Sequence, residues 1–416
     1  MDVHNAFLNG DLLEKVYMSI HSGFARQGEN GTKVCKLHKS LYGLKQAPRQ
    51  WNFKLTQVLI QLGFHQSQYD YSLFIKHEQT DIVIVLVYVD DLLITGSRQS
   101  LIDTTKEDLQ KQFKMKDLGD LKFFLGIECA RSSRGIHMSQ RKYALERIAE
   151  CGLGGARPVA TPLEQNEKLT SVQFDECIKL EKKHENPILQ NPSRYQRLVG
   201  RLLYLTMTRP DLSFSVQVLS QYMHSPKESH MEEALRVVRY IKEAPDLGLF
   251  MPAENTSQLL AYCDSDWGSC SETRRSVTGY LVKFGGALIS WKSKKQEIVS
   301  RSSAEAEFKS MANSAAEITW LVGLFKEFGV HIELPVTMVC DSKAAIQIAA
   351  NPIFHERTKR IDIDCHHVRE KICQGLLKTQ YTNTMDQLTD LLTKGLGKAQ
   401  HQLLMNDLGM MNLFKP

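Results

Sequence analysis

The sequence predicts two successive folded regions, an α+β region in the N-terminal part of the chain and a compact α/β domain near its C-terminus. Two observations favour this division. Residues 1–165 mix short apolar strands with amphipathic helices, whereas residues 257–397 read as strand, hairpin, helix, strand and helix. The second order is typical of helices packed against a mixed sheet. A chain of 416 residues is long enough for two or three domains with separate cores.

The clearest strands of the N-terminal region flank two adjacent carboxylates, Asp90 and Asp91. Residues 82–89 and 92–95 are apolar and rich in β-branched side chains, which indicates buried strands. A buried charge is costly unless it is paired, bound to metal or held at a turn. The two residues alone therefore leave two interpretations open: a hairpin whose turn is Asp-Asp, or a functional carboxylate pair.

Helices are predicted on both sides of this hairpin, over residues 47–62 and 100–113, and the first opens at Pro48. Residues 166–190 are polar and aperiodic, which predicts a linker. Residues 191–250 have a helical pattern. In them Ser225, Pro226 and Glu228 form a helix start, with Ser as N-cap, Pro in the first turn and Glu three residues after the cap.

The C-terminal domain is predicted from its strands and turns. Strands are expected over residues 259–263, 279–284, 287–291 and 336–340. Gly285 and Gly286 separate the second and third of these, which is a strong hairpin signal. Ser302 is expected to cap a long helix that runs to Phe328, and a further helix is expected over residues 342–350.

Acidic residues recur in this domain where strands end or helices begin. Asp264 and Asp341 follow predicted strands, Glu307 lies early in the long helix, and Asp390 lies late in residues 386–394. Clustered carboxylates repel one another unless cations neutralise them, and a few carboxylate oxygens suit Mg²⁺ best. Two such ions can clamp the attacking and leaving oxygens of a phosphodiester. Each acid taken singly fits an ordinary turn, but the four together favour a metal cluster.

The bulk composition restricts the class of protein. With 42% hydrophobic and 24% charged residues the chain is typical of a globular protein, and a net charge of +5 permits a polyanionic partner. Nine cysteines without any CxxC pair favour reduced thiols, and therefore the cytoplasm or nucleus rather than secretion. No apolar stretch approaches the ~18 residues of a membrane span, so no membrane partner is expected.

Four segments of the C-terminal domain resemble the ribonuclease H region of Ty1/copia-type retrotransposon polyproteins. They are YCDSDWG (262–268), RSVTGY (275–280), SSAEAEF (302–308) and DQLTDLLTK (386–394). The resemblance implies that the metal-binding acids are Asp264, Glu307, Asp341 and Asp390, with Asp386 as the fallback for the fourth. Glu305 and Asp266 are then expected near the site but pointing elsewhere. Residues 358–366 also resemble the family, although Arg360 stands where a His is usual.

Four N-terminal segments resemble the reverse-transcriptase region of the same family, in the family's order. They are MDVHNAFLNG (1–10), KSLYGLKQAPR (39–49), YVDD (88–91) and FLGIE (124–128). The resemblance implies that Asp2, Asp90 and Asp91 hold two Mg²⁺ ions while a primer 3′-hydroxyl attacks the α-phosphate of a dNTP. This favours the functional interpretation of Asp90 and Asp91.

The resemblance also assigns nucleotide and nucleic-acid contacts. It implies that Phe7 stacks under the deoxyribose, that Gln46 touches the incoming nucleotide or the template, and that Gly126 and Ile127 lie at the primer grip. Beside these, basic side chains alternate with aromatic ones, which suits phosphate contact and base stacking. The residues concerned are Lys36, Lys39, Tyr42, Lys45, Arg49 and Trp51. A solvated basic face is the alternative.

Together the pattern and the resemblance predict a reverse-transcriptase palm and thumb over residues 1–165, a linker and helical connection over 166–256, an RNase H-like domain with a mixed five-stranded sheet over 257–397, and a tail over 398–416. The implied activities are RNA-directed DNA synthesis and metal-dependent cleavage of RNA in RNA–DNA hybrids. The implied cofactor is Mg²⁺, two ions per active site, with Mn²⁺ as a substitute. The implied partners are an RNA template, a DNA primer, RNA–DNA hybrid, dNTPs and other parts of the parent polyprotein.

One departure from the family pattern concerns the start of the chain. The family's polymerase has a fingers region before the segment that carries Asp2, whereas only Met1 precedes Asp2 here. We therefore expect an N-terminally truncated member with impaired DNA synthesis, because terminal residues are poorly fixed and small displacements of catalytic groups are costly. The alternatives are an inactive nucleic-acid-binding remnant and a host-adopted interaction protein.

Overall fold

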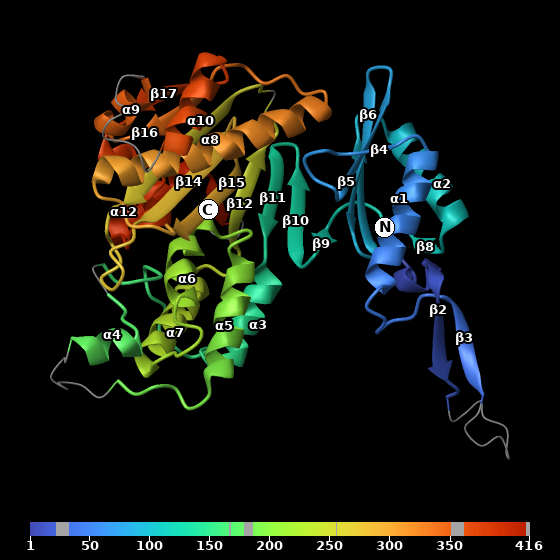
Figure 1. Cartoon of the computed structure of the whole chain (residues 1–416), viewed down its shortest axis with the longest axis horizontal. Helices are drawn as coiled ribbons and strands as arrows, with labels where there is room; N and C mark the ends of the chain where they lie inside the picture. The colour runs from blue at the N-terminus through green and yellow to red at the C-terminus, as the bar shows by residue number, and fades with distance from the viewer. Residues whose placement is uncertain (22–32, 166–167, 179–185, 255, 351–361, 413–416) are drawn as a thin grey trace. The chain divides into compact units, whose positions relative to one another are not determined.

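The computed structural model describes residues 1–21, 33–165, 168–178, 186–254, 256–350 and 362–412 (Figure 1). The chain divides into two compact units, each of which is described by itself. The first unit comprises residues 1–124 with 323–330, and the second comprises residues 125–322 with 331–416. Within the described ranges, no helix is both long enough and apolar enough to cross a membrane.

The first unit is built around a six-stranded sheet in the order β4-β5-β6-β7-β1-β8, and β2 and β3 form a separate two-stranded sheet. Its elements are β1 (Asp2–Val3), the 3₁₀ turn η1 (Ala6–Asn9), β2 (Asp11–Ser19), β3 (Val34–Lys39), α1 (Ala47–Gln61), β4 (His65–Gln66), β5 (Leu73–Glu78), β6 (Asp81–Tyr88), β7 (Asp91–Gly96), α2 (Gln99–Gln112), β8 (Met115–Lys116) and β9 (Phe123–Phe124).

The core of the first unit follows from the periodicity of its elements. Strand β6 buries every second residue, Val83, Val85 and Val87, as expected of a strand with one face in the core. Helix α1 begins with Pro48 in its first turn and buries Trp51, Leu55, Val58 and Leu59 along one stripe. The two predicted helices, 47–62 and 100–113, are confirmed as α1 and α2 to within one residue at each end.

The hairpin of β6 and β7 is confirmed, but its turn differs from the expected Asp-Asp. Tyr88 and Asp91 are directly paired residues, which leaves Val89 and Asp90 as the two-residue loop. Asp91 is therefore the first residue of a strand. The prediction was wrong by one position because the sequence does not fix the register in which two apolar strands pair.

The second unit contains two sheets and most of the helices. Its elements are β10 (Ile127–Ser132), β11 (Gly135–Ser139), α3 (Arg141–Glu150), α4 (Val172–Cys177), α5 (Pro192–Leu205), η3 (Pro210–Leu212), α6 (Ser213–Ser220), α7 (Glu228–Glu243), β12 (Leu247–Pro252), β13 (Leu259–Asp266), β14 (Val277–Phe284), β15 (Ala287–Lys295), α8 (Ser303–Glu327), β16 (Val336–Cys340), α9 (Lys343–Ala350), α10 (Asp362–Cys373), β17 (Leu377–Tyr381), η5 (Thr384–Asp386), α11 (Asp390–Thr393), α12 (Lys398–Asp407) and β18 (Met410–Asn412).

The predicted mixed five-stranded sheet is confirmed, in the order β15-β14-β13-β16-β17. Strands β13, β14 and β15 pair antiparallel, whereas β16 pairs parallel with β13 and with β17. Helix α8 lies across these strands (Figure 1), and the small side chain of Ser310 lets it approach closely. The Ser310 hydroxyl donates to the backbone oxygens of Asp264 and Gly279, at 2.8 Å each.

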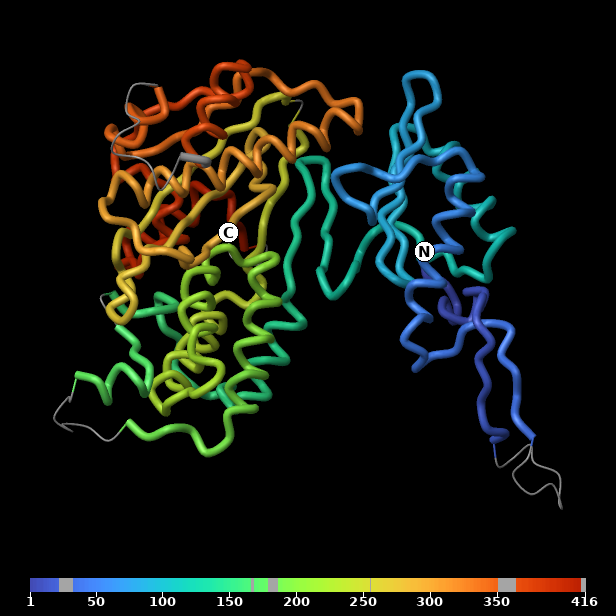
Figure 2. Tube along the Cα trace, in the orientation of Figure 1, coloured from blue at the N-terminus to red at the C-terminus, as the bar shows by residue number. Residues whose placement is uncertain are grey.

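A second sheet joins segments that are far apart in the sequence. Strands β10 and β11 pair with β12, and β12 pairs in turn with β18 near the C-terminus. Strand β18, at the red end of the colour scale in Figure 2, thus lies beside β12, which belongs to the yellow-green part of the chain. Residues from the predicted palm and thumb, from the connection and from the tail thus share one sheet. The domain boundaries at 165, 256 and 397 stay predictions.

Four local expectations need correction. Helix α7 begins at Glu228 with Lys227, not Ser225, as its N-cap, and Lys227 N donates to His230 Nδ1 at 3.0 Å in a capping box. The predicted helical stretch 191–250 ends in a strand, β12.

The predicted linker, residues 166–190, contains the short helix α4, whose Ser171 hydroxyl accepts from Phe174 N at 3.2 Å. Residues 166–167 and 179–185 of that stretch lie outside the described residues. Strand β13 also runs past the expected end at Cys263, so that Asp264 lies inside the strand rather than after it.

Gly279 on β14 provides a test of this packing, because α11 passes very close to it. An added Cβ would lie 2.6 Å from Thr393 Cγ2 and 3.1 Å from Leu392 Cβ. We expect Gly279→Ala to push α11 away from the sheet and to lower the free energy of unfolding by about 1–3 kcal/mol. Thermal unfolding followed by calorimetry measures this.

Gly200→Ala is the matched control, since Gly200 lies inside α5 with open space around its Cα. Alanine favours a helix interior, so this variant should unfold at the same or a slightly higher temperature. Equal behaviour of the two variants would contradict the close approach of α11 to β14.

Candidate active site

Asp264 and Asp390 meet at one end of the mixed sheet of the second unit, with a lysine between them. Both side chains are buried, Asp264 within β13 and Asp390 at the start of α11. Lys394 Nζ lies 2.7 Å from Asp390 Oδ1 and 3.5 Å from Asp264 Oδ2. The Thr393 hydroxyl also donates to Asp264 Oδ2, which fixes this carboxylate.

The charges at this end of the sheet shift one another's pKa. Burial, reinforced by the charge of Asp264, raises the pKa of Asp390 to about 6, although Lys394 opposes the shift. Burial alone would lower the pKa of Lys394, but the two aspartates outweigh it and the pKa is raised. Lys394 therefore stays charged and partly neutralises the pair.

Glu307 enters the same cluster from the first turns of α8. It is 7% exposed, and among the described residues its Oε2 atom meets no hydrogen-bond partner. Burial raises the pKa of Glu307 to about 10, and Asp264, Cys340 and Asp341 add to the shift. The backbone N–H of Ser265 opposes it. In the absence of a cation this carboxyl is protonated at neutral pH.

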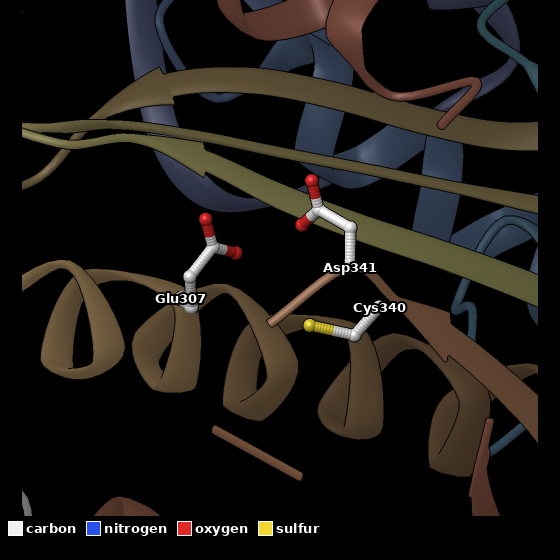
Figure 3. Close-up of side chains that lie close together, drawn as sticks. All are labelled: Glu307, Cys340 and Asp341. Atoms are coloured by element: carbon white, nitrogen blue, oxygen red, sulfur yellow. The ribbon is translucent and has the colours of Figure 1, made fainter. Parts of the chain in front are cut away.

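Asp341 and Cys340 complete the cluster at the end of β16 (Figure 3). Asp341 is half-buried, and its Oδ2 accepts from the Thr384 hydroxyl at 2.9 Å. One ligand atom each of Glu307, Cys340 and Asp341 lies within 4.8 Å of the others. Strand β16 neighbours β13, so Asp341 comes to the same sheet end as Asp264, as expected from parallel pairing.

The remaining acids predicted around the site lie differently. Asp386, the fallback for the fourth acid, is exposed in η5, whereas Asp390 is buried beside Asp264. Glu305 is engaged elsewhere, since its carboxylate accepts from Lys309 Nζ at 3.0 Å and from Arg301 N at 2.8 Å.

Asp266 is half-buried on β13, two residues from Asp264. Burial raises the pKa of Asp266, Lys394 opposes the shift and Asp264 reinforces it, so this acid lies within the field of the cluster. Of the segment 358–366, residues 358–361 with Arg360 lie outside the described residues.

This donor set fits a divalent cation. Four carboxyl groups supply oxygen ligands of the kind that Mg²⁺ and Mn²⁺ prefer. The unpartnered buried oxygen of Glu307 and the raised pKa values of Glu307 and Asp390 both indicate negative charge in excess of what Lys394 supplies. A bound cation would remove that excess and restore the ionised form of both acids.

In the first unit, strand pairing brings Asp2 opposite Asp91. Strand β1 lies between β7 and β8, with Asp2 paired to Asp91 and to Lys116. Burial raises the pKa of Asp91, and Asp90 and Asp2 add to the shift. In the described chain the carboxylate oxygens of Asp2, Asp90 and Asp91 do not all lie within 4.8 Å of one another.

The turn that carries Asp90 is held from two sides. Val89 has φ 55°, a conformation that is costly for a β-branched residue. The indole of Trp51 donates from Nε1 to Val89 O at 2.6 Å, and Val3 N donates to Asp90 O at 2.8 Å. Trp51 is 2% exposed, so the prediction that it stacks on bases was wrong. Its helix is anchored in the core instead.

The other predicted contact residues are placed as follows. Phe7 is half-buried and packs against Tyr42, with ring centroids 4.8 Å apart. Gln46 precedes α1 and donates to Glu14 Oε2 at 3.3 Å. The side chains of Lys45 and Arg49 are exposed.

Gly126 and Ile127 belong to the second unit, where Gly126 has φ +73° at the turn before β10. Their assignment to a primer grip stays a prediction.

Two members of the clusters were missed by sequence reasoning, Cys340 and Lys394. A strand residue next to Asp341 is expected to face the other side of the sheet, so Cys340 gave no signal. Lys394 lies four residues after Asp390, a spacing that places both on one helix face, and this spacing could have indicated the pair.

The raised pKa of Glu307 predicts how stability depends on pH in metal-free protein. The folded chain keeps this carboxyl protonated up to about pH 10, whereas the unfolded chain ionises it near pH 4.5. The folded state therefore binds more protons between these values, and the free energy of unfolding falls as pH rises through that window. We expect Glu307→Gln, which cannot titrate, to reduce this fall.

Calorimetry in EDTA at several pH values measures the effect as a difference in Tm that grows with pH. Glu307→Ala is the control: it also cannot titrate, so it should share the shallower pH dependence while its cavity lowers Tm throughout. Parallel curves for the wild type and Glu307→Gln would contradict the raised pKa.

Comparison with known proteins gives concordant similarities. Residues 1–165 match the family model described as reverse transcriptase (RNA-dependent DNA polymerase). The chain is 42% identical to the retrovirus-related Pol polyprotein from transposon RE2 of Arabidopsis thaliana over 99% of this chain and 28% of that protein. The chain thus spans less than a third of the length of that relative.

A further relative is matched over its whole length. The putative transposon Ty5-1 protein YCL074W of Saccharomyces cerevisiae is 32% identical over 76% of this chain and 100% of that protein. Among solved structures, the chain is similar to the N-terminal RNase H domain of rv2228c from Mycobacterium tuberculosis, with 8% identity and a TM-score of 0.25. The match covers 36% of the present chain and 98% of the mycobacterial one, and with this TM-score it carries no argument. On the sequence relationships, the chain belongs to the family of Ty1/copia-type retrotransposon Pol polyproteins.

Proposed function

We propose that the second unit is a metal-dependent nuclease that hydrolyses the RNA strand of RNA–DNA hybrids. One observation carries the proposal: Asp264, Glu307, Asp341 and Asp390 come from four separate elements and form one electrostatically linked cluster at the end of one mixed sheet. A cluster of this kind is what phosphodiester hydrolysis with paired divalent ions requires.

The residues of the cluster divide the work between holding cations and orienting ligands. The four acids would hold the ions, Mg²⁺ or Mn²⁺, and Asp390 rather than the exposed Asp386 is the fourth. A bound divalent ion supplies positive charge that activates water and stabilises the phosphate in the transition state. The Thr393 and Thr384 hydroxyls orient Asp264 and Asp341.

A lysine-rich cavity elsewhere on the second unit favours a polyanionic partner. The cavity, of about 220 Å³, is lined by Lys292, Lys294, Lys295 and Lys309 together with the acids Glu297 and Asp364. Lysine side chains attract a phosphate backbone without reading its sequence. The lysines of this cavity are thus suited to contact with the phosphates of a hybrid duplex.

The proposal predicts Mg²⁺-dependent cleavage of a labelled RNA–DNA hybrid by the purified chain. Asp264→Asn keeps the size of the side chain but removes a charge, so we expect cleavage to fall ~10²-fold or more. Asp390→Asn should behave likewise, and gel separation of the labelled RNA measures both.

Asp386→Asn is the matched control, since it removes an exposed carboxylate from the same segment and should leave cleavage unchanged. Full cleavage by Asp264→Asn would contradict the site. Loss of cleavage in Asp386→Asn with retention in Asp390→Asn would show that the fourth acid is Asp386.

RNA-directed DNA synthesis is the second candidate function, and it belongs to the first unit. The pairing of Asp2 with Asp91 and the hold of Trp51 on the adjacent turn favour a carboxylate site that takes two Mg²⁺ ions, dNTP, primer and template. Lys45 and Arg49, both exposed, would contact phosphates. Other parts of a Pol polyprotein are proposed partners.

We expect primer extension by this chain to be at or near background. Strand β1, which carries Asp2, is only two residues long, and misplacement of a catalytic group by ~1 Å already costs ~10²-fold in rate. Extension of a labelled primer on an RNA template, with hybrid cleavage as the positive control, measures this.

Robust extension that Asp90→Asn abolishes would refute impairment. Absence of both activities in a folded sample that still binds hybrid would favour an inactive nucleic-acid-binding remnant. Absence of binding as well would favour an interaction protein that keeps the fold for packing alone.

A further inference from the structure

Cys340 adds a sulfur atom to the carboxylates at the end of β16. Its Sγ and one carboxylate oxygen each of Glu307 and Asp341 all lie within 4.8 Å of one another. Figure 3 shows Glu307 on its helix facing the strand end from which Asp341 and Cys340 project. The three residues thus come from two elements that pack face to face, and we refer to them as the mixed-donor site.

The position of the sulfur is fixed by the sheet. Cys340 is fully buried, and its strand is paired on both sides, with β13 and with β17. Ser342 N approaches Cys340 Sγ at 3.4 Å. Cys263 on β13 is also buried, with its Sγ 3.6 Å from Val339 O, and its thiol contacts the Cys340 side chain. It is not among the three residues whose donor atoms all lie within 4.8 Å of one another.

Glu307 provides a second, independent sign of a ligand. Its side chain is more than nine-tenths buried, it faces Cys340 and Asp341, and in the described part of the chain Oε2 has no hydrogen-bond partner. A buried polar atom without a hydrogen-bond partner is energetically unfavourable. A cation between the three residues would satisfy it.

The donor types select the cation. Mg²⁺ prefers oxygen ligands and gains little from sulfur, whereas Zn²⁺ and Cd²⁺ accept thiolate, carboxylate and water together. In a tetrahedral zinc site with Zn–S of ~2.3 Å and Zn–O of ~2.0–2.2 Å, sulfur and oxygen lie roughly 3.5 Å apart. The present donor atoms, all within 4.8 Å of one another, would have to approach more closely by side-chain rotation of Glu307 and Asp341.

We propose that Cys340, Glu307 and Asp341 form a binding site for a thiophilic divalent cation, Zn²⁺ or Cd²⁺, in addition to the hard ions of the proposed reaction. On binding, the Cys340 thiol and the Glu307 carboxyl would each give a proton to solvent, and the cation would take the thiolate sulfur and the carboxylate oxygens as ligands. The same two carboxylates then no longer serve Mg²⁺. The binding of Zn²⁺ or Cd²⁺ is inferred from the geometry of the three residues. The competition of these ions with Mg²⁺ for the two carboxylates rests on the proposed function.

Titration of the full chain with Cd²⁺, followed by the ultraviolet sulfur-to-cadmium charge-transfer band, tests the site. We expect Cys340→Ser to lose one equivalent of the band, with Cd²⁺ affinity at this site lowered more than about 100-fold, beyond the effect of removing an outer partner. Cys129→Ser is the matched control, because it removes a half-buried thiol on β10, outside the mixed-donor site, and should retain the equivalent. The exposed cysteines contribute equally to all three samples.

Glu307→Gln keeps every thiol and offers a second variant in case Cys340→Ser fails to fold. It should weaken the same equivalent, whereas Glu305→Gln should not. An unchanged band in Cys340→Ser, equal loss in the two cysteine variants, or an unchanged affinity in Glu307→Gln would overturn the inference.

The two proposals fail separately. Hybrid cleavage without the Cd²⁺ equivalent at Cys340 contradicts the mixed-donor site and leaves the nuclease proposal intact. The Cd²⁺ equivalent without hybrid cleavage supports the mixed-donor site and contradicts the nuclease. With both present, Zn²⁺ should inhibit cleavage by the wild type, and Cys340→Ser should raise the inhibiting concentration more than about tenfold.

Discussion

The parallel pairing of β13 with β16 is the constraint on which the candidate site of the second unit depends. Parallel neighbours end at the same edge of a sheet, so this pairing brings Asp264 and Asp341 together although 77 residues separate them in the sequence. Helix α8 can then bring Glu307 to the same edge because the small side chain of Ser310 lets the helix approach the strands closely. Gly279 in the same way leaves room for α11, which carries Asp390. The small residues under the helices are therefore as important for the site as the acids themselves.

The acids are stable together only because several compensations act at once. Two unit charges ~4–5 Å apart repel by about 3–4 kcal/mol at an effective dielectric constant of about 20. Lys394 offsets part of this between Asp264 and Asp390, protonation of Glu307 offsets another part, and hydrogen bonds from Thr393 and Thr384 hold two of the carboxylates. A divalent cation would replace the proton on Glu307. Electrostatic repulsion among the carboxylates therefore remains in the metal-free cluster, and a bound cation would reduce it.

In the first unit, hydrogen bonds to backbone carbonyls fix the loop that carries the carboxylate of Asp90. The loop between β6 and β7 places Val89 at positive φ, and the cost is met by hydrogen bonds from Trp51 and Val3 to the loop carbonyls. Because Trp51 belongs to the buried face of α1, the orientation of the loop is tied to the packing of the whole core. Helix α1, which carries the exposed Arg49, and the loop that carries Asp90 are thereby linked through one indole.

The sequence by itself determined the helices α1, α2 and α8, the hairpin about Gly285 and Gly286, the mixed sheet and the family, because these depend on local periodicity, turn chemistry and short motifs. It also named the four acids of the cluster. The tertiary structure alone decided the register that makes Asp91 a strand residue, the burial of Trp51, the short helix α4 and the sheet that unites β11, β12 and β18. It also decided that Cys340 joins the carboxylates. These features depend on which distant segments pack together and on where each side chain then points, and a linear pattern carries no information on either.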